Sequence, residues 1–104
     1  MNRGPDAGTL LVRALAEAAL RAGCAATVIE MEMQRWASVT FTGARHAITI
    51  EGEGCDALET WLQLLPEAEF ALRGHLVADL TVEAVRRAGG RVVAEVEMLT
   101  VEER

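Results

Sequence analysis

The chain has 104 residues, which is enough for one domain with a single hydrophobic core. Hydrophobic residues make up 51% of it and charged residues 25%, a balance typical of a globular domain and not of a disordered segment. The net charge of −6 disfavours nucleic acid as a partner, because binding to phosphates requires a basic surface. No apolar run reaches the roughly 20 residues of a membrane helix, so we expect no membrane partner.

The N-terminal part predicts a leader followed by a helix. We expect residues 1–8 to be a flexible leader and a helix to run to about Ala22, with Thr9 or Asp6 as its N-cap. Gly23 is placed to end this helix, since glycine readily adopts the left-handed conformation found there. Its buried face would carry Leu11, Leu15 and Ala19 among others.

From Thr27 onwards the hydrophobic period changes to two, which predicts strands. In residues 27–34 the apolar face would carry Ile29, Met31 and Met33, with Val28 on the opposite face. We expect a two-residue turn at Gly43-Ala44 between two further strands, because glycine suits the first position of a type II′ turn. That register would place Phe41 opposite His46 and Val39 opposite Ile48.

The second half predicts another helix and a long hairpin. A helix would begin near Asp56 and end at Pro66. Two strands, of residues 75–84 and 92–99, would follow around Ala88-Gly89-Gly90. Their expected partners are Leu80 with Met98, Val82 with Val96 and Ala84 with Ala94.

The resulting element order, α-β-β-β-α-β-β, favours an α+β fold. We expect residues 9–104 to form one two-layer sandwich, with both helices on one face of a mainly antiparallel sheet of about five strands. The other face of the sheet would remain uncovered.

Few residues are available for catalysis. The sequence has two histidines, two cysteines, one serine and no lysine, and it lacks the usual zinc-ligand spacings. The Gly52-x-Gly54 motif lacks the third glycine and the lysine of phosphate-binding loops. His46 is interpreted as a hydrogen-bonded core residue. Cys24 and Cys55 are too few for a disulfide framework, which favours reduced thiols and a cytoplasmic location.

Acidic residues gather in the middle of the uncovered face: Glu30, Glu32, Glu83, Glu95 and Glu97. The predicted register places Glu83 directly opposite Glu95, which is unfavourable unless a cation intervenes. We favour a solvated face relieved by nearby arginines such as Arg45, Arg73 and Arg87, and expect no cofactor. The alternative is a divalent-metal site formed by Glu83, Glu95 and Glu97, since hard cations prefer carboxylate oxygens.

Apolar residues on the same face indicate a surface for a partner. The predicted set is Trp36, Val77, Val85, Val93, Leu99 and Val101. Val77 would lie opposite Val101, and Val85 opposite Val93. We expect a homodimer that forms through this face or through an edge strand.

Three functions remain open at this stage. The first is a non-enzymatic, self-associating module that binds a protein or a small ligand. The alternative is a small enzyme that uses His75 with Asp79 or with the carboxylates of the uncovered face, with or without a divalent metal. A purely structural subunit of a larger complex is the third.

Overall fold

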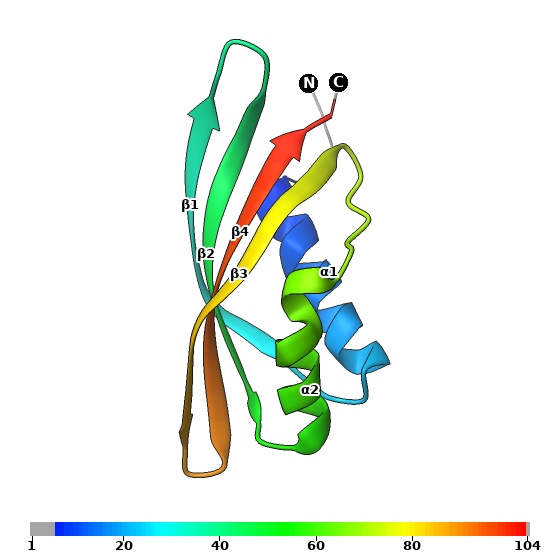
Figure 1. Cartoon of the computed structure of the whole chain (residues 1–104), viewed down its shortest axis with the longest axis vertical. Helices are drawn as coiled ribbons and strands as arrows, with labels where there is room; N and C mark the ends of the chain where they lie inside the picture. The colour runs from blue at the N-terminus through cyan, green and yellow to red at the C-terminus, as the bar shows by residue number, and fades with distance from the viewer. Residues whose placement is uncertain (1–5, 104) are drawn as a thin grey trace.

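The computed structural model describes residues 6–103 as one antiparallel sheet with two helices packed on one face (Figure 1). The elements in chain order are α1 (Ala7–Arg21), β1 (Thr27–Ala37), β2 (Thr42–Glu53), α2 (Asp56–Leu64), the 3-10 helix η1 (Leu65–Glu67), β3 (His75–Ala88) and β4 (Arg91–Glu102). The strand order is β1-β2-β4-β3, so β1 and β3 are the edges. The predicted α+β sandwich is confirmed, but the described residues form four strands and not five.

Helix α1 begins at Ala7, within the predicted leader. The carboxylate of Asp6 accepts a hydrogen bond of 2.8 Å from the backbone N–H of Thr9, so Asp6 is the N-cap and Thr9 is not. Gly23 follows the helix with a φ of 90°, as predicted for its end. Residues 1–5 of the predicted leader lie outside the described residues.

The predicted turn at Gly43-Ala44 is wrong, because both residues lie inside β2. The chain reverses instead at residues 38–41, where the Ser38 hydroxyl accepts hydrogen bonds from the N–H groups of Thr40 and Phe41. β1 and β2 are therefore one long hairpin. Met33, and not Phe41, lies opposite His46.

Three β-bulges decide which side chains face the helices. An extra residue at Ile29 places Val28 opposite Ile50, on the helix-covered face and not on the uncovered one. Extra residues at Ala78 and Glu83 divide β3 into three segments. The central pairs, Leu80 with Met98 and Val82 with Val96, are as predicted, but Ala84 pairs with Glu95 and not with Ala94.

The core lies between the two helices and the covered face of the sheet. Its fully buried side chains include Leu11 and Leu15 of α1, Leu58 of α2, Ile48 of β2 and Met98 of β4. The helices are shorter than the sheet, so the tips of both hairpins extend beyond them (Figure 1). No described helix is long and apolar enough to span a membrane.

A pair of charge-assisted hydrogen bonds ties α2 to β3. The Arg87 guanidinium donates from Nε and Nη2 to the two carboxylate oxygens of Glu59, over 2.7 and 2.6 Å. These bonds hold the pKa of Glu59 below its usual value and raise that of Arg87. Arg87 therefore lies on the covered side. The prediction from the sequence that it relieves the acidic open face is wrong.

Candidate functional site

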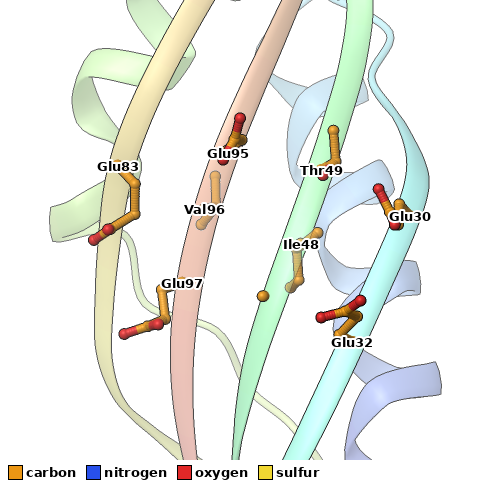
Figure 2. A pocket seen from close by; sticks show the side chains of 9 residues that line it. Glu30, Glu32, Ile48, Thr49, Glu83, Glu95, Val96 and Glu97 are labelled. Atoms are coloured by element: carbon orange, nitrogen blue, oxygen red, sulfur yellow. The ribbon is translucent and has the colours of Figure 1, made fainter.

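The face of the sheet opposite the helices, here called the open face, is ordered in rows that cross the strands. One row combines Glu32 of β1, Ala47 of β2 and Glu97 of β4, and the next combines Glu30, Thr49 and Glu95. The side chains of β2 are short and those on both sides of it are long. The result is a hollow of about 270 Å³ along β2, flanked by carboxylates (Figure 2).

Five glutamates line this hollow, which we call the glutamate trough: Glu30, Glu32, Glu83, Glu95 and Glu97. The structure thus confirms that the acidic residues singled out in the sequence lie together. Glu83 does not face Glu95, however, because it is the extra residue of a bulge and Ala84 takes that position.

The charges of the trough are only partly balanced. Arg86 lies 2.7 Å from Glu95, and Arg45 lies 3.8 Å from Glu97. Glu30, Glu32 and Glu83 make no ion pair with any residue that the structure describes. The trough therefore carries an excess of negative charge, although Arg45 contributes to its relief as expected.

The predicted metal alternative does not fit this arrangement. Glu95 and Glu97 lie on β4, and Glu83 is the extra residue of a bulge on β3, so the direct opposition of Glu83 and Glu95 that suggested a cation is absent. Among the described residues, no three His, Cys, Asp or Glu side chains are grouped closely enough to hold a metal ion. Glu83, Glu95 and Glu97 line one hollow without forming a coordination site.

A row of apolar residues and one glycine, here called the apolar row, lies near one end of the open face. It crosses all four strands as Trp36, Gly43, Val101 and Leu76. A Cβ built on Gly43 would lie 2.7 Å from the Trp36 ring and would collide with the carbonyl oxygen of Thr100, so only glycine fits here. The Trp36 indole Nε1 is buried in this position without a hydrogen-bond partner.

The predicted partner residues divide between the two faces. Trp36, Val93, Leu99 and Val101 lie on the open face, as predicted. Val77 and Val85 do not, because the bulges of β3 place them opposite Thr100 and Ala94, where they pack against the core. Leu76, which is 54% exposed, takes the predicted place of Val77 opposite Val101.

The proposed catalytic pair of His75 and Asp79 is separated by the sheet. His75 pairs with Glu102 and lies on the helix side, whereas Asp79 pairs with Leu99 on the open face. The bulge at Ala78 between them causes this inversion. His75 consequently cannot act with Asp79 or with the carboxylates of the trough.

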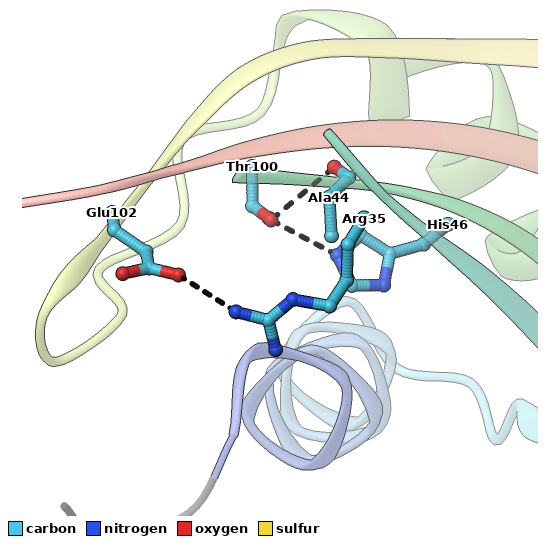
Figure 3. Close-up of polar contacts among 5 residues, drawn as sticks. All are labelled: Arg35, Ala44, His46, Thr100 and Glu102. Atoms are coloured by element: carbon cyan, nitrogen blue, oxygen red, sulfur yellow. Dashed lines mark hydrogen bonds and ion pairs between the residues drawn. The ribbon is translucent and has the colours of Figure 1, made fainter. Parts of the chain in front are cut away.

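A second hollow, of about 460 Å³, lies on the helix side of the sheet beside the N-terminus of α1. Its polar lining is His75 together with charged groups of both signs: Asp6, Arg35, Arg73, Glu102 and Glu103. Arg35 and Glu102 approach to 3.6 Å at its rim (Figure 3). Sequence reasoning missed this group because its members are far apart in the chain and match no motif.

Beneath this hollow the imidazole of His46 and the hydroxyl of Thr100 are hydrogen-bonded over 3.0 Å (Figure 3). Such a pair can activate a hydroxyl for nucleophilic attack, but only where a substrate can reach it. His46 is 0% and Thr100 1% exposed, so their contact is part of the core, as predicted for His46. Burial lowers the pKa of His46, and the nearby carboxylate of Asp6 partly opposes this effect.

Neither cysteine forms a disulfide. The Cys24 thiol is buried and donates to the carbonyl oxygen of Ala19 over 3.4 Å, and its burial raises its pKa. Cys55 is exposed at the start of α2. Cys24 is thus a packing residue.

No protein-family model matches this chain, and no curated protein matches it. The function therefore has to be inferred from the two faces of the sheet.

Proposed function

We propose that this chain is a non-enzymatic protein-binding module whose open face takes a basic segment of its partner. The observation that supports this proposal is the glutamate trough, which has carboxylates on both sides of β2. The apolar row lies beyond it, on the far side of the row that Gln34, Arg45 and Leu99 form. A guanidinium or ammonium group lying over β2 would be attracted from both sides. The apolar row would contact an aliphatic or aromatic side chain of the same segment.

The spacing of the rows specifies this segment further. Trp36 and Glu32 are four residues apart on β1, which corresponds to about 13 Å in a strand. An extended partner would match this spacing with an apolar residue followed, four and six positions later, by arginine or lysine. A second copy of the chain is a poor occupant of this face, because its own glutamates would be brought against the trough.

Peptide binding tests the proposal. The probe is a fluorescently labelled peptide, Leu-Gly-Gly-Gly-Arg-Gly-Arg, and the control peptide has glutamate in place of both arginines. We expect fluorescence anisotropy to show binding of the arginine peptide only, with an affinity that falls as salt is raised. Equal binding of the two peptides, or no binding of either, would contradict the proposal.

A pair of matched variants locates the site. Glu30→Gln/Glu32→Gln removes two charges from the trough and should weaken binding about tenfold, at about 0.7 kcal/mol for each exposed contact. Glu67→Gln/Glu69→Gln removes the same charge from the connection after α2, and should leave the affinity unchanged. Equal weakening by both variants would show that only the net charge matters.

A further inference from the structure

The two edges of the sheet differ in how well they could pair with another strand. An edge strand presents unpaired backbone N–H and C=O groups, and bulges are a common way to prevent their pairing. β3 is interrupted twice, at Ala78 and Glu83. β1 is interrupted once, at Ile29 near its start, which leaves Glu30–Ala37 as a regular run without proline or lysine.

An apolar groove accompanies this regular edge on the helix side. It has a volume of about 400 Å³ and lies between α1 and β1, where Val12, Met31 and Met33 line it. Met31 reaches across to α1, since a Cβ on Gly8 would lie only 2.8 Å from its Cε. Met33 remains 47% exposed beside the groove, and flexible methionines are well suited to contact a partner surface.

We propose that a second copy of this chain pairs with β1 along its free edge, antiparallel and about a two-fold axis at Met33. This inference goes beyond the proposed function, because it uses the edge and the helix side and leaves the open face free. The two sheets would join into one, and the two Met33 side chains would meet beside the grooves.

The charges along β1 select this register. In an antiparallel pair, directly opposed residues point to the same face of the sheet, and neighbouring residues of one strand point to opposite faces. The two-fold axis must therefore pass through a residue position, because an axis between two residues would oppose residues of different faces. An axis at Met31 would oppose Glu30 with Glu32, and an axis at Glu32 would oppose Glu32 with itself. An axis at Met33 opposes Glu32 with Gln34, Glu30 with Trp36 and Met31 with Arg35, without any like-charged pair.

Axes further along the strand are less favourable. An axis at Arg35 would bring two guanidinium groups together. An axis at Gln34 also avoids like charges, but it opposes Met33 with Arg35 and so keeps the two Met33 side chains apart. The register at Met33 is therefore the one that avoids like charges and also brings the two Met33 side chains together beside the grooves.

Light scattering coupled to size exclusion tests whether the dimer exists. The wild-type chain should have twice the monomer mass of 11.2 kDa. Met33→Arg places two positive charges at the axis and should give a monomer with an unchanged circular dichroism spectrum. Thr81→Arg on the other edge should remain dimeric. A monomeric wild type, or a Met33→Arg variant that stays dimeric, would overturn the proposal.

Disulfide cross-linking tests the register. Directly opposed Cα atoms lie about 4.5–5.5 Å apart, within the range that a disulfide can bridge. In a Cys55→Ser background, which removes the exposed native thiol, Met33→Cys should form a covalent dimer under mild oxidation. Gln34→Cys should do so much more slowly. The reverse order would exclude the axis at Met33, and neither result depends on whether the open face binds a basic peptide.

Discussion

The two faces of this sheet are built from alternate residues of the same strands, yet they have different compositions. On β4, Val96 and Met98 are buried under the helices, whereas Glu97 and Leu99 lie half-buried on the open face. The covered face is apolar and carries a hydrogen-bonded His46. The open face carries five glutamates and, beyond the row of Gln34, Arg45 and Leu99, an apolar row. Stability and the proposed partner binding should thus respond separately to substitutions at neighbouring residues.

Neighbouring truncations on β4 should separate the two faces most clearly. Met98→Ala removes a fully buried side chain and should lower the free energy of unfolding by about 2–5 kcal/mol. Leu99→Ala removes a half-buried one and should cost about 1 kcal/mol. Urea denaturation of both variants measures the difference. Equal losses would mean that the open face is packed as tightly as the core.

At Gly43 the open face has no room for a side chain. Gly43→Ala introduces a Cβ against the Trp36 ring and the Thr100 carbonyl, and should cost about 1–3 kcal/mol. It should also shift the Trp36 fluorescence. Gly74→Ala is no matched control because φ there is 82°, whereas Gly54→Ala meets its nearest atom at 3.3 Å and should cost less. A neutral Gly43→Ala variant would contradict the close approach of Trp36 and Thr100 to Gly43.

His46 should make the stability of the covered face depend on pH. Its pKa is lowered in the folded state by burial, so the unfolded chain binds the proton more readily. The stability is therefore complete above the unfolded pKa of about 6.5 and falls as the pH drops below it, by at most about 1.4 kcal/mol per pH unit. Urea denaturation at pH 7.5 and 5.5 measures this loss.

His46→Gln is the control for this pH effect, since glutamine is polar but does not titrate. It should be less stable than the wild type at pH 7.5 but should lose much less stability between the two pH values. The carboxyls of Asp6 and Glu59 have lowered pKa values, so their contributions are lost only at more acidic pH. A loss of stability equal in wild type and variant would assign the effect to another group.

Neutralising the trough should have the smallest effect on folding. Glu30→Gln/Glu32→Gln alters two exposed side chains without an ion-pair partner among the described residues, and should change the free energy of unfolding by within about 0.5 kcal/mol. Any change should be stabilising, since like charges are removed. A large loss in urea denaturation would show that these carboxylates hold the sheet together.

The sequence predicts the two-layer fold and the acidic patch because both depend on the alternation of apolar and polar residues along the strands, and most of each strand keeps this alternation. β4 alternates from Val92 to Thr100 without interruption, and its central pairs with β3 are as expected. The errors concern the bulges. A bulge inverts every following side chain, and neither Ala78 nor Glu83 is a residue type that marks one. Val77, Val85 and His75 were expected on the open face and lie on the covered side for this reason, whereas Asp79 lies on the open face as predicted.

The turn and the second hollow show two further limits. A glycine can form a turn or can make room for a neighbouring side chain. Gly43 makes room for the ring of Trp36, which lies on the neighbouring strand β1, and the local sequence around Gly43 does not show this contact. Ser38 was the available signal for the turn, because serine often accepts hydrogen bonds from the backbone at such positions. The helix-side hollow, by contrast, brings together residues from both ends of the chain, which no local pattern reveals.

The two tryptophans offer the most direct test, because Trp36 lies on the open face and Trp61 is buried in the core on α2. Their indole N–H groups give separate signals in a ¹H–¹⁵N NMR spectrum of the labelled protein. Addition of the arginine peptide should move the Trp36 signal progressively and leave that of Trp61 in place. An unmoved Trp36 signal, or equal movement of both, would contradict the assignment of binding to the open face.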